Sequence, residues 1–143
     1  MGLSRVFFDS NLWIYMIEDT GERSARVRSI VERMSVRRDE LLTSTLTLSE
    51  VLAKPVAMGE TALAERYESV LSGPGISVLA FDRAAARIFA ELRKDKSLKP
   101  PDAIQLSCAA TARCDLFITN DERLSRKVVP GIQFIASLER AFL

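Results

Sequence analysis

Short apolar segments of strand length alternate with longer segments of helix length along the chain, and this alternation constrains the fold more than any other feature. The strand-like segments are residues 5–8, 41–44, 76–81, 115–119 and 133–135. The main helix-like segments are residues 11–17, 22–38, 45–53, 59–72, 82–94 and 102–113. Strands separated by helices pair in parallel, with helices covering both faces of the sheet. We therefore expect an α/β/α sandwich with a central, mostly parallel sheet of four to five short strands.

Length and composition indicate one globular unit. The 143 residues suit a single domain, 1–143, with one core. Hydrophobic residues make up 48% and charged residues 27%, which is typical of a globular chain rather than a disordered one. No apolar stretch approaches the ~18 residues that suggest a membrane span. Arg5 and Asp9 interrupt the early apolar run that a signal peptide would need, so we expect a cytoplasmic protein. Cys108 and Cys114 lack metal-ligand spacing and are expected to be reduced packing residues.

Four acidic residues stand where these segments begin, end or are interrupted. Asp9 and Asp121 each follow a strand-like segment, Asp102 opens a helix-like segment after two prolines, and Glu50 interrupts an apolar helix. A carboxylate beside a core is costly unless it is paired or bound to a cation. Four such residues from four separate segments predict a site for a hard divalent cation.

The absence of histidine narrows the chemistry. Ser-His-Asp and Cys-His hydrolases would lack their general base, and histidine-ligated zinc proteases and haem proteins would lack a ligand. The six glycines form none of the nucleotide-binding fingerprints. A metal site must therefore be built from oxygen ligands, which favour Mg²⁺ or Mn²⁺ over Zn²⁺.

The fold itself is expected to bring the four acids together. In an open parallel sheet, ligands bind outside the carboxyl ends of the strands, near the switch in strand order. Asp9 and Asp121 meet at that edge if the two preceding strands are neighbours. Asp102 shares a helix face with Leu106 and Ala109, so it can point along the side that faces the sheet. Glu50 shares a helix face with apolar Leu46, Ala53 and Ala57, so neither acid is expected to be an ordinary solvent-facing charge.

Each acid also fits an ordinary structural role. Asp9 and Asp102 are suited to capping helices. Glu50 fits a partly buried salt bridge, and Asp121 fits a turn after Asn120. The residues alone leave these alternatives open.

Four motifs, in order along the chain, carry a family resemblance. VFFDSNL at 6–12 is similar to an opening strand with its Asp and nearby Asn, and SEVL at 49–52 to a helical Glu. PDAIQLSCAA at 101–110 is similar to a proline-aspartate-alanine helix with small residues, and LFITND at 116–121 to a Thr-Asn-Asp strand end. With these motifs the chain resembles the PIN-domain ribonucleases, and most closely the VapC-like toxins of toxin–antitoxin pairs.

Two positions depart from the family pattern. Ser10 stands where many relatives carry threonine, which keeps a hydroxyl. Many relatives carry a further acid after the strand end, for which Glu122 is the candidate here. The usual Asp-Phe pair is replaced by Arg123-Leu124. A fifth acidic ligand is therefore in question.

The resemblance implies a PIN-like fold and a metal-dependent endoribonuclease. The implied ligands of one or two Mg²⁺ or Mn²⁺ ions are Asp9, Glu50, Asp102 and Asp121. Hydrolysis would leave a 5′ phosphate and a 3′ hydroxyl. Asn11 and Thr119 are expected to hydrogen-bond a carboxylate or a metal-bound water, although both also fit ordinary polar positions at a helix start and a strand end.

A net charge of +1 gives no global attraction for a polyanion, so RNA binding needs a local basic patch. The candidates near the acidic edge are Arg93, Lys94, Lys96, Lys99, Arg123 and Arg126. A solvated charged loop is the alternative interpretation of these residues. The resemblance further implies a cognate antitoxin, a homodimer and no membrane contact.

Three other functions remain open at this point. One is a PIN nuclease in RNA processing outside a toxin pair. Another is a catalytically inactive PIN domain that serves as a binding module. An aspartyl-phosphate phosphatase is disfavoured, because Asn11 stands where that class needs a second Asp after Asp9.

Overall fold

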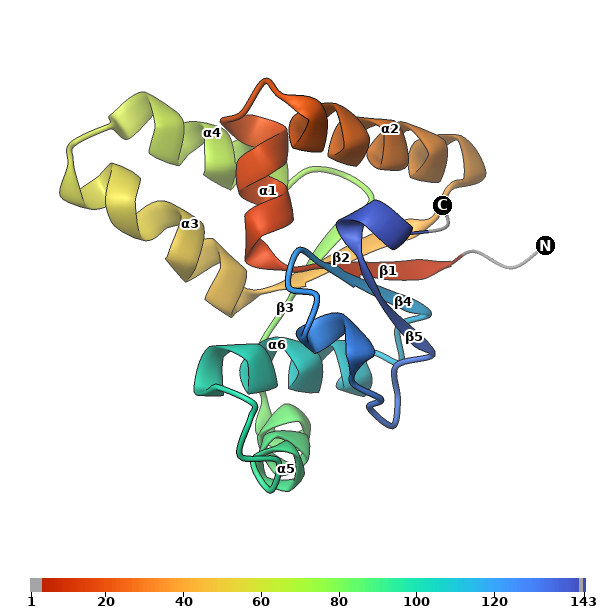
Figure 1. Cartoon of the computed structure of the whole chain (residues 1–143). Helices are drawn as coiled ribbons and strands as arrows, with labels where there is room; N and C mark the ends of the chain where they lie inside the picture. Colours follow the sequence, from red (N-terminus) through yellow and green to blue (C-terminus); the bar gives the residue numbers. More distant parts are fainter. Residues whose placement is uncertain (1–3, 142) are drawn as a thin grey trace.

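Five parallel strands form the centre of the computed structural model, which describes residues 4–141 and 143 (Figure 1). The strands are β1 (Arg5–Phe8), β2 (Glu40–Ser44), β3 (Ile76–Leu79), β4 (Leu116–Thr119) and β5 (Phe134–Ser137). Their order across the sheet is β3-β2-β1-β4-β5, and every neighbouring pair is parallel. The expected α/β sandwich is confirmed, with five strands.

Helices cover both faces of the sheet (Figure 1). One face carries α1 (Ser10–Ile17), α2 (Glu22–Arg37), α3 (Thr45–Ala57) and α4 (Thr61–Leu71). The other carries α5 (Arg83–Leu92) and α6 (Pro100–Thr111). Two short 3-10 helices, η1 (Leu124–Arg126) and η2 (Leu138–Arg140), flank β5. In the described part of the chain, no helix has the length and apolar character needed to cross a bilayer.

The central strand β1 divides its side chains between two cores. Val6 and Phe8 pack into the layer under α1–α4, and Phe7 packs into the layer over α5 and α6. All three are fully buried, and Phe7 stacks on Phe117 of β4 with ring centroids 4.9 Å apart. Because strand side chains alternate between faces, a slip of one residue would exchange the two sets. Burial on both faces therefore fixes the register of β1.

The strand order reverses direction between β1 and β4. From β1 the chain runs outward through β2 to β3, then crosses back to place β4 on the other side of β1. The two strands are tied beyond their ladder by the Asp9 N–H, which donates to the Ile118 carbonyl at 3.0 Å. A crevice at such a switch point is where open α/β sheets bind ligands.

Helix α3 differs from the sequence expectation in its length. The sequence predicted a helix over residues 45–53, but α3 continues to Ala57 with Pro55 buried inside it. Proline removes one backbone donor from a helix, yet the ladder resumes at once: the Met58 N–H bonds to the Lys54 carbonyl at 3.0 Å. Burial of the proline ring and these later bonds keep the last turn helical.

Candidate functional site

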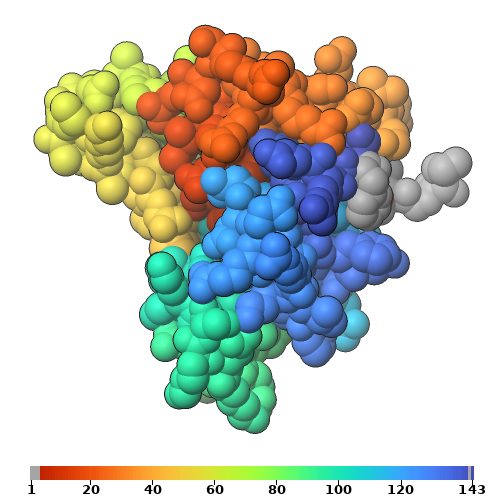
Figure 2. Space-filling model, in the orientation of Figure 1, coloured from red at the N-terminus to blue at the C-terminus, as the bar shows by residue number. Residues whose placement is uncertain are grey.

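The four acids predicted from the sequence line one cleft of about 250 Å³ at the carboxyl edge of the sheet. They come from four parts of the chain: Asp9 from the β1–α1 junction, Glu50 from α3, Asp102 from the first turn of α6, and Asp121 from the segment after β4. These parts border one another on the face shown in Figure 2. The topology, with β1 beside β4, is what brings Asp9 and Asp121 to the same edge.

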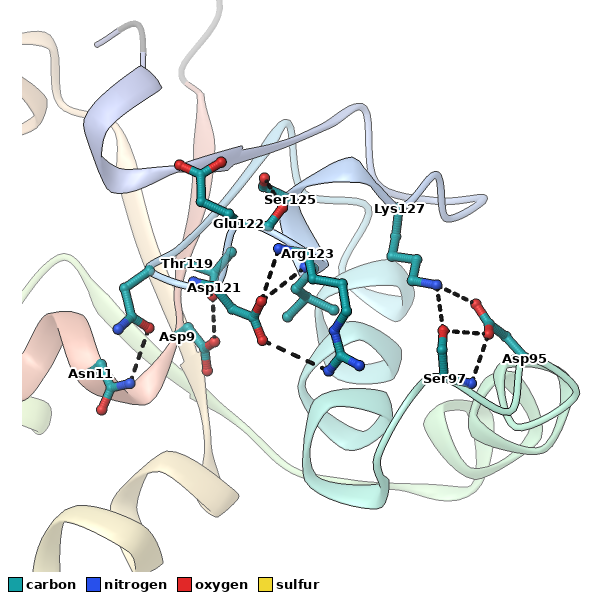
Figure 3. A network of polar contacts seen from close by, with 12 residues as sticks. Asp9, Asn11, Asp95, Ser97, Thr119, Asp121, Glu122, Arg123, Ser125 and Lys127 are labelled. Atoms are coloured by element: carbon teal, nitrogen blue, oxygen red, sulfur yellow. Dashed lines mark hydrogen bonds and ion pairs between the residues drawn. The ribbon is translucent and has the colours of Figure 1, made fainter.

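Asp9 caps a helix and faces the cleft at the same time. Its Oδ1 accepts from the Ser10 N–H at 2.9 Å, which caps α1. Its Oδ2 accepts from the Thr119 hydroxyl at 2.9 Å. The Thr119 oxygen in turn accepts from the Asp121 N–H at 3.1 Å, so one hydroxyl links the two acids (Figure 3). Asp9 therefore both caps α1 and lines the cleft, so its two predicted roles are compatible.

Glu50 lies at the rim of the cleft. The prediction that it shares a helix face with buried apolar residues was wrong. Its side chain is exposed, and the buried residues of α3 are Thr47, Val51 and Pro55 rather than the Leu46 face. The reason is the rotation of the helix about its axis. Because α3 starts directly after β2, the residues that face the core are Thr47 and those at intervals of four after it, Val51 and Pro55. The Glu50 carboxylate accepts from the Ser10 hydroxyl at 2.6 Å.

Asp102 and Asp121 differ in how their charge is compensated. Asp121 Oδ1 accepts from the backbone N–H groups of Arg123 and Leu124 at 2.9 and 3.2 Å, which is the turn role that the sequence left open. The Arg123 guanidinium lies 4.0 Å from Asp121 Oδ2. Asp102 is partly buried, and no described residue donates a hydrogen bond to its carboxylate. Of the four acids, Asp102 is therefore the one that relies on nearby charges, those of Arg123 and Lys99, rather than on hydrogen bonds from the described residues.

Burial and mutual repulsion act on the protonation of two of the acids. Desolvation raises the pKa of Asp9, opposed by its hydrogen bonds with Ser10 and Thr119 and reinforced by the charge of Asp102. Desolvation also raises the pKa of Asp102, with the nearby charge of Asp121 as the next cause. Negative charge in this cleft is thus incompletely neutralised by the protein itself.

The donor set fits a hard divalent cation. All four acids offer carboxylate oxygens, the ligands that Mg²⁺ and Mn²⁺ prefer, and the Asp102 carboxylate has no hydrogen-bond donor among the described residues. Within residues 4–141 and 143, no three acidic or cysteine side chains are close enough to form a finished metal site. The carboxylates form an open rim that a cation would have to draw together, with Glu50 at its exposed side.

The polar residues beside the acids occupy different positions from one another. Asn11 lines the cleft, but its amide donates to Asn120 Oδ1 at 3.0 Å rather than to an acid (Figure 3). Asn120 donates onward to the Tyr15 hydroxyl at 2.9 Å. Glu122 lines a separate hollow with Ser137, and Figure 3 shows its carboxylate directed away from Asp121. A role for Asn11 toward a metal-bound water stays a prediction, and Glu122 lies outside the cleft.

The six basic candidates separate into three pairs. Lys99 and Arg123 lower the pKa of Asp102 through their charge, so both lie near the cleft. Arg93 and Lys94 are engaged elsewhere, by the Phe89 ring at 5.9 Å and by Glu91 at 2.8 Å. Lys96 and Arg126 are exposed. The sequence did not single out Lys127, which bonds Asp95 and Ser97 at 2.8 and 2.6 Å and ties the α5–α6 loop to the segment after η1 (Figure 3).

Sequence reasoning assigned no role at this site to Ser10 and Gln105, both of which line the cleft. The available signals were the position of Ser10 beside Asp9 and of Gln105 one helical turn after Asp102. Neither signal says that a side chain reaches acids on other elements, because that depends on the packing of α6 against α1 and α3.

Solved structures with the same fold come from toxin–antitoxin complexes. VapBC2 of Rickettsia felis, bound to a promoter DNA fragment, matches with a TM-score of 0.74 and 16% identity over 93% of this chain and 98% of that chain. A toxin–antitoxin complex of Klebsiella pneumoniae matches with a TM-score of 0.66 and 23% identity over 89% of this chain and 94% of that chain. VapC20 of Mycobacterium tuberculosis, a sarcin–ricin loop cleaving toxin, matches with a TM-score of 0.68 and 13% identity over 87% of this chain and 99% of that chain. At these identities the likeness shows the fold alone.

Sequence comparison assigns the family directly. No curated protein sequence matches this chain. The family profile described as the PIN domain matches residues 6–129, which contain all four acids of the cleft and most of the chain. The protein belongs to the PIN-domain family.

Proposed function

We propose that the protein is a metal-dependent endoribonuclease that hydrolyses RNA phosphodiester bonds at the four-carboxylate cleft. The observation that carries the proposal is the convergence of Asp9, Glu50, Asp102 and Asp121 from four separate elements of a PIN domain. Mg²⁺ or Mn²⁺ fits their oxygen donors. When bound, the cation would supply Lewis-acid activation of water and would stabilise charge at the scissile phosphate.

The protein's own side chains would hold the cation, fix the spacing of the acids and bind the RNA phosphates. Asp9, at the end of the central strand, would be the central ligand of the cation site, because Asp102 and Asp121 line the same cleft beside it. Thr119 fixes the spacing between Asp9 and Asp121 through its two hydrogen bonds. Lys99 and Arg123, beside the cleft, would bind the phosphates of the RNA next to the cleaved bond.

We further propose that this nuclease is the toxin of a toxin–antitoxin pair, acting in the cytoplasm and inhibited by a cognate antitoxin. The support is the fold shared with toxins solved in complex with antitoxins, and with one solved toxin described as cleaving the sarcin–ricin loop. A homodimer is part of the proposal. An RNA-processing nuclease outside a toxin pair is the alternative, and four retained acids argue against an inactive binding module.

The test is cleavage of a mixed pool of structured and single-stranded RNA in Mg²⁺, Mn²⁺ or EDTA. We expect metal-dependent cutting by the wild type and a loss of about 100-fold or more in Asp9→Asn. Asp82→Asn is the matched control, because Asp82 caps α5 outside the cleft and asparagine caps equally well. Cutting that persists in EDTA, or full cutting by Asp9→Asn, would contradict the proposal.

A further inference from the structure

A buried amide lies beneath the acidic cleft. Gln105 of α6 is 2% exposed, one helical turn beyond Asp102. Its Oε1 accepts from the Ser44 hydroxyl at the end of β2. Its Nε2 donates to Thr47 Oγ1 at 2.7 Å and Ser10 Oγ at 3.1 Å, with a longer contact to Asp9 Oδ1 at 3.4 Å. One side chain thus joins α6 to β2, α3, α1 and Asp9.

The direction of these hydrogen bonds follows from the carboxylates at their end. The Glu50 carboxylate accepts only, so the single hydroxyl hydrogen of Ser10 goes to Glu50. Ser10 is then left to accept from Gln105 Nε2, and it can act only as an acceptor in its 3.2 Å contact with Thr47. Thr47 Oγ1 also accepts from Gln105 Nε2. The neighbouring Thr43 hydroxyl lies 3.0 Å from the Phe8 carbonyl, which can only accept, and 2.8 Å from Thr47 Oγ1.

The same constraint fixes the orientation of the Gln105 amide. A flipped amide would set Oε1 against the carboxylate oxygen Asp9 Oδ1 and against the Ser10 oxygen, whose hydrogen is already used. It would also turn the NH₂ group toward Ser44. With Nε2 toward the cleft, the amide donates to Thr47, Ser10 and Asp9, while its Oε1 accepts from Ser44, so both ends of the amide are satisfied.

We propose that Gln105 is a positioning residue of the active site: it holds the carboxylate of Asp9 directly, and that of Glu50 through Ser10, in the orientation that binds the cation. The inference rests on the proposed metal-dependent function. A neutral amide suits this role, because it restricts the two acids without cancelling their charge, whereas a lysine would compete with the cation. Groups of this kind commonly change metal affinity by about 10–100-fold when removed.

The first test compares Gln105→Met with Ser107→Ala by calorimetric titration of Mn²⁺ into the metal-free protein. Methionine nearly preserves the buried volume and removes the amide. Ser107 is equally buried on α6 but bonds only the carbonyl of Ala103 in its own helix. We expect Gln105→Met to bind Mn²⁺ about 10–100-fold more weakly and Ser107→Ala to match the wild type. RNA cleavage by Gln105→Met should recover as Mn²⁺ is raised, which a general folding defect would not allow.

Ser10→Ala is the second variant, because loss of a buried amide in Gln105→Met carries a risk to folding. Ser10 is partly exposed at the start of α1, so its removal tests the link to Glu50 without opening the core. We expect weaker Mn²⁺ binding, and an effect of Gln105→Met that is smaller in the Ser10→Ala background than alone.

Side-chain NMR provides a readout that is independent of catalysis. The chain contains two glutamines, Gln105 and the exposed Gln133. We expect Mg²⁺ to shift the side-chain amide signals of Gln105 and leave those of Gln133 unchanged. Wild-type Mn²⁺ affinity in both Gln105→Met and Ser10→Ala would overturn the inference while the nuclease proposal stands. Absence of metal binding in the wild type would instead overturn the proposed function.

Discussion

At the residue scale, the acids of the cleft are held in place by donors that do not fully compensate their charge. Asp9 receives hydrogen bonds from Ser10, Thr119 and Gln105, yet burial still raises its pKa. Asp102 receives none from the described residues, and its pKa is raised as well. A raised carboxyl pKa means that the ionised group destabilises the folded state. This cost to stability is the kind that a functional site imposes, and it supports the cation site that we propose.

This imbalance predicts that Asp102→Asn stabilises the metal-free protein. The folded-state pKa of Asp102 lies above its ordinary value of 3.8. The penalty is therefore present at neutral pH and is relieved as the pH falls through the raised value. We expect a gain on the order of 1 kcal/mol at pH 7, or about 2–4 °C in Tm, that shrinks toward pH 4. Thermal unfolding in EDTA measures it, and a lower Tm for the variant at pH 7 would contradict the prediction.

At the element scale, the sequence predicted the strand–helix alternation and the motifs that place the acids at element ends. Strand β1 was recognisable because Val6, Phe7 and Phe8 form an apolar run, and α6 because Asp102 opens a helix of small residues. The buried face of α3 and the reach of Gln105 were not predictable. Both depend on how α3 and α6 pack against their neighbours, which residue spacing within one helix does not encode.

A close approach between α6 and the loop before β5 gives an element-scale prediction. A β-carbon at Gly131 (φ +98°) would lie 2.8 Å from the Ala110 carbonyl oxygen, whereas one at Gly59 (φ +69°) would meet open space. Both positions carry left-handed strain, but only Gly131 adds a clash with backbone. We expect Gly131→Ala to lower the free energy of unfolding by about 2–3 kcal/mol and Gly59→Ala by about 1 kcal/mol. Urea titrations measure both values, and an equal loss of unfolding free energy in Gly131→Ala and Gly59→Ala would show that the approach of Gly131 to Ala110 is not tight.

At the scale of the whole molecule, charge is nearly balanced, at +1, while the acids and a few basic groups are concentrated at one edge. The RNA binding that we propose must then rely on local contacts rather than on a long-range field. Lys99 and Arg123 are the groups that act on Asp102, whereas Lys94 is occupied by Glu91.

The local patch predicts a specific salt dependence. Lys99→Gln and Arg123→Gln should each weaken the binding of a single-stranded RNA. Each should also reduce the slope of log affinity against log salt by about 1. Lys94→Gln, the matched control, should leave the slope unchanged. Binding of RNA to the Asp9→Asn protein, which is designed not to cleave, provides the measurement. An equal change of the salt slope in Lys99→Gln, Arg123→Gln and Lys94→Gln would show that the RNA binds elsewhere on the surface.

The central claim is that four carboxylates from four elements form one cation site. Its most direct test is calorimetric titration of Mn²⁺ into the metal-free wild type and into Asp9→Asn, Glu50→Gln, Asp102→Asn and Asp121→Asn, with Asp82→Asn as the control. We predict that each of the four cleft variants binds Mn²⁺ more weakly than the wild type and that the control binds equally well. Wild-type affinity in all four cleft variants would contradict the account.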